Sequence, residues 1–342
     1  MTAPFRILIP DAQFDGEPAV EQAVAGDAAA FMVHRASRPA EIPGADWAAA
    51  DAVLLWHVID LDQAVAETLE RCRVVVRVGI GVDRVDLAAC GRRGIPVCNV
   101  PSYDMTDVAT TAVTMALDLM RGVTSYTTAL RADLAGNWRW RGPPAIRRVR
   151  GRRFGVVGCG RIGTAALMRA RGFGIAVGYH DPYLAVGHDL ALGVARFATL
   201  ADLLAWADVV SLHTPLNDET RHLIDAAAVA GMKPGLILIN CARGGLVDLD
   251  ALAAGIRDGR IAAAGLDAFE REPPPPHPLL DAWQRAEPWI DGRLVLTPHG
   301  SWYSPETFDD LRRDAATTAL DYLARGDLRN CVNGPHLTGP RI

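Results

Sequence analysis

Short apolar runs alternate with helix-like segments along almost the whole chain. Ten runs have the length and residue types of buried strands, and they lie at 5–9, 52–56, 74–78, 96–100, 154–157, 175–179, 209–213, 236–240, 262–266 and 294–297. Strands that alternate with helices in this way predict parallel sheets covered by helices. Because a long helical stretch separates the fourth run from the fifth, two sheets fit better than one. We therefore predict an α/β protein with two doubly wound parallel-sheet domains.

Two amphipathic helices are predicted at the junctions between these domains. Apolar residues recur at intervals of three and four between Ala109 and Met120, which indicates a helix over about 103–122. Ser304 followed by Pro305 has the pattern of a helix N-cap and a first-turn proline. A final helix is therefore expected there, and it is expected to return to the first domain.

Two segments lack this periodicity. Residues 123–149 are predicted to form an arm that covers another surface, with a plain surface loop as the alternative; they include Trp138, Trp140, Pro143 and Pro144. The proline-rich run 273–278 is expected to be extended and to lie in a surface insertion.

Composition and charge narrow the class of partner. In the 342-residue chain, 50% of the residues are hydrophobic, which is enough for about two buried cores. No apolar run approaches the roughly 18 residues that span a bilayer, and the first apolar stretch is too short for a secretory signal. The net charge of −5 provides no basic surface for nucleic acid. We therefore expect a cytoplasmic protein that binds a small molecule, with neither a membrane nor a nucleic acid as its partner.

The cysteines and arginines each limit one kind of argument. The six cysteines are widely scattered and have no metal-ligand spacing, which predicts reduced thiols and no metal site. Lys233 is the sole lysine among 35 basic residues, so an arginine at any one position is weak evidence by itself.

The strongest local motif is a glycine loop between a strand and a helix. The predicted strand 154–157 runs directly into Gly158, Gly160 and Gly163. In this spacing the first glycine permits a tight turn, the second lets backbone N–H groups approach a pyrophosphate, and the third allows close packing of helix on strand. The loop therefore predicts a dinucleotide site. Arg161 is expected either to flank the pyrophosphate or to be solvated, and Cys159 is expected to be a small buried filler.

An acidic residue at the end of the next strand indicates which dinucleotide is bound. Asp181 follows the strand 175–179 and lies 18 residues beyond Gly163. A carboxylate at this distance accepts hydrogen bonds from the adenosine ribose and repels a 2′-phosphate, so NAD is favoured over NADP. The alternative is a turn or N-cap aspartate without a ligand.

Three later strands each end in a residue that suits acid–base chemistry. Arg243 follows the strand 236–240, the acids Asp267, Glu270 and Glu272 follow 262–266, and His299 follows 294–297. A guanidinium binds a carboxylate and polarises a carbonyl, an imidazole passes a proton, and a carboxylate stabilises the imidazolium. Hydride transfer to a 2-oxo acid needs these three groups. If His299 is considered without the other two groups, the alternative is an ordinary histidine at the start of a loop with no catalytic role.

With these motifs the chain resembles the D-isomer-specific 2-hydroxyacid dehydrogenase family over nearly its whole length. The resemblance rests on Arg77-Val-Gly-Ile-Gly81-Val-Asp83, Asn99-Val-Pro101, the glycine loop through Asp181, Leu212 to Leu216, Asn240 to Asp248, Gly265-Leu266-Asp267 and Thr297-Pro298-His299. Within the family, the segments 181–184, 299–304 and 330–333 are most similar to the branch that contains the C-terminal-binding proteins, which are NAD(H)-binding transcriptional corepressors.

The resemblance implies roles for individual residues. It implies that Arg243, Glu272 and His299 are the catalytic set, and Glu272 is preferred to Glu270 because it directly precedes a proline. Substrate contacts are implied for Arg77, Gly79, Ile80, Gly81 and Trp302, with a core aromatic as the alternative for Trp302. Cofactor contacts are implied for Gly158, Gly160, Arg161, Ile162, Gly163, Asp181, Thr214, Pro215, Asn217, Cys241, Ala242, Asp267, His299 and Gly300, and Asp267 is expected to hold the nicotinamide amide.

The resemblance also implies a domain plan and an activity. Residues 1–100 and 301–342 are expected to form a smaller flavodoxin-like substrate domain, and 101–300 a Rossmann NAD-binding domain, with the active site in the cleft. The segment 103–149 is expected to be the linking helix and dimer arm of a homodimer. The predicted activity is interconversion of a small 2-oxo acid and its D-2-hydroxy acid with NAD(H). The alternative is an NAD(H)-sensing regulator that binds a protein partner. A formate dehydrogenase is not expected, because its reaction transfers only a hydride and does not need the acid–base pair Glu272 and His299.

Two departures from the family pattern concern the cofactor and one concerns a loop. Cys241 stands where the family often has threonine, and Val108 stands where the branch has a threonine near the nicotinamide. The insertion 273–293 between Glu272 and His299 is long and proline-rich.

Overall fold

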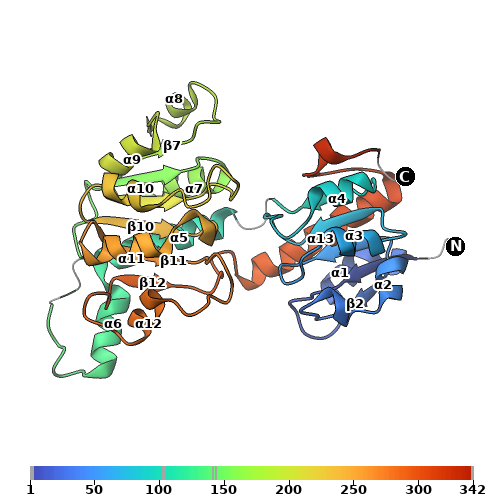
Figure 1. Ribbon diagram of the computed structural model, residues 1–342, viewed down its shortest axis with the longest axis horizontal. Coiled ribbons are helices and arrows are strands. Elements are labelled where there is room, and N and C mark those ends of the chain that lie inside the picture. The colour runs from blue at the N-terminus through green and yellow to red at the C-terminus, as the bar shows by residue number, and fades with distance from the viewer. Residues whose placement is uncertain (1–3, 102–104, 141, 143–144, 340–342) are drawn as a thin grey trace. The chain divides into compact units, whose positions relative to one another are not determined.

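The chain divides into two compact units. Its structure, a computed structural model, describes residues 4–101, 105–140, 142 and 145–339 (Figure 1). Unit 1 comprises Met1–Asp104 and Ser304–Ile342, and unit 2 comprises Met105–Tyr303. Each unit contains one parallel sheet, so the predicted α/β class with two parallel-sheet domains is confirmed.

Unit 1 is built on a five-stranded sheet with the order β2-β1-β3-β4-β5. This order places the second strand outside the first, as in flavodoxin-like folds. The strands are β1 (Phe5–Ile9), β2 (Ala29–Val33), β3 (Ala52–Leu55), β4 (Val74–Arg77) and β5 (Val97–Asn99). The helices are α1 (Ala19–Ala25), α2 (Gly44–Ala49), α3 (Gln63–Thr68), α4 (Leu87–Arg92) and α13 (Pro305–Arg325).

Helix α13 belongs to unit 1 although it follows unit 2 in the sequence. The Ser304 hydroxyl accepts a hydrogen bond from the Thr307 N–H, and Pro305 occupies the first turn, as the sequence predicts. The helix packs against α1 and against strands β3 and β4. Arg312 of α13 forms a buried bidentate ion pair with Glu21 of α1, at 2.8 and 2.6 Å. This pair fixes the register of α13 on α1.

Unit 2 contains a seven-stranded sheet with the order β12-β11-β10-β9-β6-β7-β8. The order reverses beside β6, as in doubly wound dinucleotide-binding sheets, and ligands of such sheets bind where this reversal occurs. The strands are β6 (Arg153–Val157), β7 (Ala176–His180), β8 (Ala195–Arg196), β9 (Val209–Leu212), β10 (Leu236–Asn240), β11 (Ile261–Leu266) and β12 (Leu294–Leu296).

Helices cover both faces of this sheet because its central strands are buried on both sides. In β10 the residues Ile237 and Ile239 pack into one core, while Leu236 and Leu238 pack into the other. The helices are α5 (Met105–Arg121), α6 (Val123–Ala132), α7 (Arg161–Arg171), α8 (His188–Leu192), α9 (Leu200–Trp206), α10 (Ala226–Gly231), α11 (Leu249–Arg257) and α12 (Pro278–Gln284). Helices α5 and α7 contribute to the first core, and α9 to α11 contribute to the second.

The ten predicted strands are all present, whereas three elements differ from the prediction. Strands β2 and β8 were not predicted, and both are edge strands. β8 has only two residues, and β2, although apolar at all five positions, is largely half-exposed. The segment 123–149, predicted without periodicity, begins with the helix α6. Residues 103 and 104 of the predicted linking helix, and Pro143 and Pro144 of the arm, lie outside the described residues. No helix in the described part of the chain is long and apolar enough to cross a lipid bilayer.

Candidate active site

The glycine loop leaves room for a ligand at one of its three glycines. Gly158 has φ +83°, and a Cβ there would lie 2.9 Å from the backbone of His213 and Thr214. A Cβ at Gly163 would lie 2.0 Å from the Gly158 carbonyl oxygen. At Gly160, the N-cap of α7, a Cβ would meet nothing within 4 Å. Two glycines are thus needed by the fold itself, and Gly160 faces open space at a helix N-terminus.

Asp181 folds back onto the glycine loop. One of its carboxylate oxygens accepts the Cys159 N–H at 2.9 Å, and the other accepts the Tyr183 N–H at 3.0 Å. The carboxylate therefore closes its own turn as well as lying beside the loop. Arg196 of β8 donates to the Asp181 carbonyl at 3.3 Å and to the Leu184 carbonyl at 2.9 Å. An arginine distant in sequence thus lies near Asp181, with its donors directed at backbone carbonyls.

The loop after β9 is organised by its own side chains. The Asn217 side chain accepts the N–H groups of Glu219 and Thr220, each at 3.0 Å, and the Thr220 hydroxyl donates to the Pro215 carbonyl. Before this loop, burial lowers the pKa of His213 to about 4, so its imidazole is neutral near pH 7. His213 precedes Thr214 and contacts the Ser211 hydroxyl at 2.8 Å.

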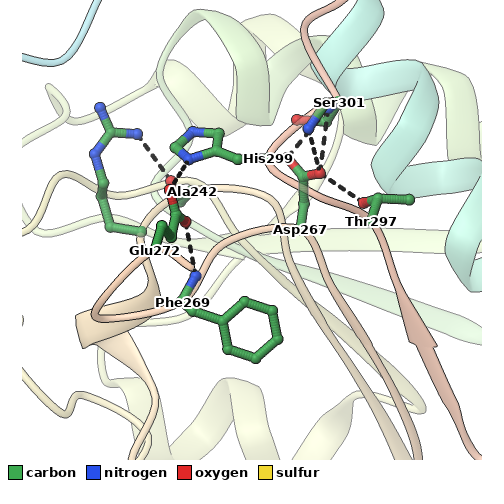
Figure 2. Close-up of polar contacts among 9 residues, drawn as sticks. Ala242, Asp267, Phe269, Glu272, Thr297, His299 and Ser301 are labelled. Carbon is green, nitrogen blue, oxygen red and sulfur yellow. Dashed lines mark hydrogen bonds and ion pairs between the residues drawn. The ribbon is translucent and has the colours of Figure 1, made fainter. Parts of the chain in front are cut away.

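His299 and Glu272 form a direct pair, which Figure 2 shows. The Nδ1 atom of His299 lies 2.7 Å from one oxygen of Glu272, and the other oxygen accepts the Phe269 N–H at 2.9 Å. Burial tends to raise the pKa of Glu272. The hydrogen bond and charge of His299, the Phe269 N–H and the charge of Arg243 outweigh burial, so the pKa lies below its usual value. The exposed Glu270 instead pairs with Arg221 at 2.8 Å.

Asp267 anchors the turn that carries His299 (Figure 2). Its side chain is 1% exposed and accepts the Thr297 hydroxyl at 2.5 Å, the Gly300 N–H at 2.9 Å and the Ser301 N–H at 3.2 Å. The Asp267 carbonyl accepts the His299 N–H at 2.8 Å. His299 itself has φ +53°, a conformation that non-glycine residues adopt mainly where the surroundings impose it. The buried carboxylate therefore holds the histidine in place.

Arg243 begins a tight turn beyond β10. The buried Asn240 side chain donates to the Arg243 carbonyl at 2.9 Å and accepts the Ala242 N–H at 3.1 Å. The Arg243 guanidinium donates to the Ala242 carbonyl at 2.9 Å. A Cβ at Gly244 would lie 1.8 Å from the carbonyl carbon of Phe269, so the Arg243 turn touches the loop that leads to Glu272. Neither Asn240 nor Gly244 was predicted to have a role of its own at the site.

Four residues of unit 2 named in the sequence analysis, Val108, Ile162, Cys241 and Trp302, contact the core that helices α5 and α7 cover. Cys241 is 7% exposed, its thiol lies 3.8 Å from the Met115 sulfur, and burial and then the charge of Asp267 raise its pKa. Val108 is buried in α5, whereas Trp302 packs partly buried against the same core. Arg161 is exposed at the start of α7, and Ile162 beside it is half-buried.

The predicted substrate residues of unit 1 lie at the carboxyl end of strand β4 and in the loop that follows it. Arg77 ends the strand and donates to the Val78 carbonyl, and Gly79 has φ +137°. The Asn99 side chain donates to the Ile80 carbonyl at 2.8 Å, which fixes the segment that contains Gly81.

Asp11, which was not predicted, lies at the same edge of the sheet. This buried carboxylate accepts the N–H groups of Trp56, Val58 and Ile59. Burial raises the pKa of Asp11, against the opposing effect of those N–H groups and of the Arg77 charge. An aspartate two residues beyond a buried strand was the available sequence signal. The described residues contain no group of three or more His, Cys, Asp or Glu side chains that could hold a metal ion.

Comparison with known proteins identifies the second unit. Residues 113–301 match the family model for "D-isomer specific 2-hydroxyacid dehydrogenase, NAD binding domain". C-terminal-binding protein 1 of Caenorhabditis elegans is 33% identical over 292 residues, which is 82% of this chain and 39% of that protein. D-3-phosphoglycerate dehydrogenase of Mycobacterium leprae is 36% identical over 284 residues, 83% of this chain and 51% of that protein. The chain thus spans about half or less of the length of these curated relatives. A crystal structure of a Thermus thermophilus protein has a TM-score of 0.80 at 31% identity, covering 96% of this chain and 100% of that one.

Proposed function

Because the chain belongs to the D-isomer-specific 2-hydroxyacid dehydrogenase family, with its NAD-binding domain at residues 113–301, we propose that it is an NAD(H)-dependent enzyme that interconverts a small 2-oxo acid and its D-2-hydroxy acid. The observation that carries the proposal is the 2.7 Å contact between His299 and Glu272 at the carboxyl edge of the unit 2 sheet. A family member that used only hydride transfer would have no need for this acid–base pair.

His299 is the proton donor and acceptor in this proposal. Its Nδ1 atom is engaged by Glu272, so Nε2 is the atom that gives a proton to the carbonyl oxygen during reduction and takes it back during oxidation. The lowered pKa of Glu272 keeps its carboxylate ionised at neutral pH. That charge stabilises the imidazolium and fixes the ring orientation.

Arg243 binds the substrate and polarises its carbonyl group. A guanidinium forms paired hydrogen bonds with a carboxylate and stabilises negative charge that develops on an adjacent oxygen. Its contribution to the lowered pKa of Glu272 indicates that its charge acts at this site. In unit 1, Arg77 and the backbone of residues 79–81 are proposed to bind the substrate carboxylate, with Trp302 of unit 2 beside its side chain.

The residues of the glycine loop fit a dinucleotide. Gly160 leaves open space at the N-terminus of an 11-residue helix, where backbone N–H groups favour a pyrophosphate. Asp181 would hold the adenosine ribose, and the carboxylate of Asp267 still has an oxygen with acceptor capacity for the nicotinamide amide. When bound, the nicotinamide supplies or accepts the hydride. The remaining cofactor contacts are proposed for Arg161, Ile162, Gly163, Thr214, Pro215, Asn217, Cys241, Ala242 and Gly300.

The test is turnover of a panel of 2-oxo acids, with His299→Ala beside the unchanged protein. The panel comprises glyoxylate, pyruvate, hydroxypyruvate, phenylpyruvate and phosphohydroxypyruvate, and the loss of NADH absorbance is followed. His299→Ala is expected to lower turnover of the best substrate by about two to four orders of magnitude, with NADH affinity nearly intact. Equal turnover by both proteins would remove His299 from the mechanism.

A regulatory protein of the corepressor type is the second candidate. The similarity to C-terminal-binding protein 1 of Caenorhabditis elegans favours it. A regulatory function predicts tight NADH binding without turnover of any acid in the panel. It also predicts a protein partner whose binding depends on NADH. Turnover that depends on His299 would decide for the enzyme.

We propose that the protein forms a homodimer through residues 103–149. Trp138 and Trp140 are 76% and 89% exposed in this segment, and tryptophan is enriched at protein interfaces. Light scattering of the unchanged protein should give twice the chain mass. The double variant Trp138→Ser/Trp140→Ser should contain a larger fraction of monomer. A monomer at all concentrations would contradict this assignment.

A further inference from the structure

Two cysteines of unit 1 lie directly opposite each other in an antiparallel bridge. Cys98 is the middle residue of β5, and Cys331 lies in the segment that follows α13. The Asn99 N–H donates to the Asn330 carbonyl at 3.2 Å, and the Val332 N–H donates to the Val97 carbonyl at 2.8 Å. These two bonds flank the cysteines on either side. The cysteines therefore form a non-hydrogen-bonded pair, the type in which facing side chains approach most closely.

The spacing of such a pair suits a disulfide. Facing Cα atoms in non-hydrogen-bonded pairs lie about 4.5 Å apart, and disulfides span Cα separations of about 4.4 to 6.8 Å. Directly opposite side chains also project from the same face of the ladder. We propose that Cys98 and Cys331 are a redox pair that forms an intrachain disulfide on exposure to a peroxide and so fastens the C-terminal segment to β5.

The surroundings of the two thiols place them together. The Cys331 thiol contacts the Asn333 side-chain oxygen at 3.3 Å, and the same oxygen accepts the Val97 N–H at 2.8 Å. This keeps the Cys331 side chain beside β5. The pKa of Tyr322 in α13 is raised, mainly by burial. The charge of Arg73 opposes this effect, and the two thiols add to it. Both sulfur atoms therefore lie close enough to one tyrosine to influence it.

The two cysteines differ in accessibility, which gives the reaction an order. Cys331 is half-buried, whereas Cys72, Cys90, Cys98, Cys159 and Cys241 are all buried. Burial, and then the charge of Cys331, raise the pKa of Cys98 to about 12. The thiolate of Cys331 is thus the group that a solvent-borne oxidant reaches first.

The chemistry balances with hydrogen peroxide as the oxidant. The Cys331 thiolate attacks one peroxide oxygen, the O–O bond breaks, and the released hydroxide takes a proton to become water. The sulfur of Cys98 then attacks the resulting sulfenic acid, the S–O bond breaks, and the thiol proton leaves with that oxygen as a second water. Two thiols are oxidised to one disulfide, and one peroxide is reduced to two waters.

The experiment measures the cross-link directly and does not depend on the proposed function. The full chain is reduced, exchanged into buffer, treated with hydrogen peroxide and digested without reductant for mass mapping. We expect one linked pair of peptides that contains Cys98 and Cys331, migration as a single chain in a non-reducing gel, and an apparent melting temperature raised by roughly 5 to 10 °C. A reductant should reverse all three changes.

Matched variants separate the pair from other thiols. Cys331→Ala, whose side chain is half-exposed and whose loss leaves the core intact, should abolish the cross-link and the thermal shift. Cys90→Ala is the control, because Cys90 is also buried in unit 1 and burial also raises its pKa to about 12. It should retain both. Over-oxidation of Cys331 with Cys98 still alkylatable, a link from Cys331 to a different cysteine, or a link between two chains would each overturn the proposal.

Discussion

The buried carboxylate of Asp267 offers a sharp test of how the site is held together. In Asp267→Ala, the Thr297 hydroxyl and the N–H groups of Gly300 and Ser301 lose their acceptor. Each unsatisfied buried donor costs about 1–3 kcal/mol, with more for bonds to a charged partner. Thr297 and Gly300 are half-buried, so water replaces part of their loss, whereas Ser301 is 3% exposed. We expect the free energy of unfolding of unit 2 to fall by about 3 to 5 kcal/mol.

The same substitution should also lower turnover. The turn 297–301 carries His299, and a misplacement of about 1 Å can cost about a hundredfold in rate. Asp267→Asn, which keeps one acceptor oxygen, should lie between the unchanged protein and Asp267→Ala in both stability and rate. A parallel loss of rate and stability across this series is the signature of a positioning role.

Asp225→Ala is the matched control for this series. Asp225 is an exposed aspartate of the same unit that caps α10 through the single N–H of Ala228 at 2.8 Å. Its loss should cost about 1 kcal/mol, without an effect on turnover. Urea denaturation followed by tryptophan fluorescence measures the stability of all three variants. A cost for Asp267→Ala no larger than that of Asp225→Ala, with full turnover, would refute the reasoning.

Three further predictions concern the cofactor loop and the acid–base pair. Gly160→Ala should leave the melting temperature unchanged but weaken NADH binding at least about tenfold. Gly163→Ala should lower both the melting temperature and the NADH affinity, because its Cβ would lie 2.0 Å from the Gly158 carbonyl oxygen. Equal melting temperatures of the two variants in calorimetry would contradict the assignment. Asp181→Ala should weaken NADH binding and relax discrimination against NADPH in fluorescence titrations, and an unchanged ratio of the two affinities would count against the ribose contact. The lowered pKa of Glu272 stabilises the fold above the unfolded-state value of about 4.3, and this contribution is lost as the pH falls through the folded-state value. The stability difference between the unchanged protein and Glu272→Gln, measured by urea denaturation, should therefore be largest near neutral pH and shrink below about pH 4, and a difference that grows in acid would reverse the assigned sign.

Local patterns were sufficient where a structural requirement is local. The spacing of Gly158, Gly160 and Gly163 reflects one turn between a strand and a helix, and apolar runs reveal strands that are buried on both faces. The edge strand β8 has only two residues, which is too short for any periodicity to appear, and the edge strand β2 was missed although its five residues are apolar. The helix α6 lacked a core-facing stripe because none of its residues is buried.

The contacts at the site, in contrast, join residues that are far apart in sequence. Glu270 and Glu272 lie two residues apart in the sequence, and both follow the same strand. The fold pairs Glu270 with Arg221 and Glu272 with His299. Nothing near Asp267 in the chain indicated that its carboxylate would anchor a turn about thirty residues later. Composition and periodicity thus determined the two sheets, the glycine loop and the residue types at the strand ends. The tertiary structure decided which of those groups meet, because strand order and turn geometry set side-chain distances that no local pattern encodes.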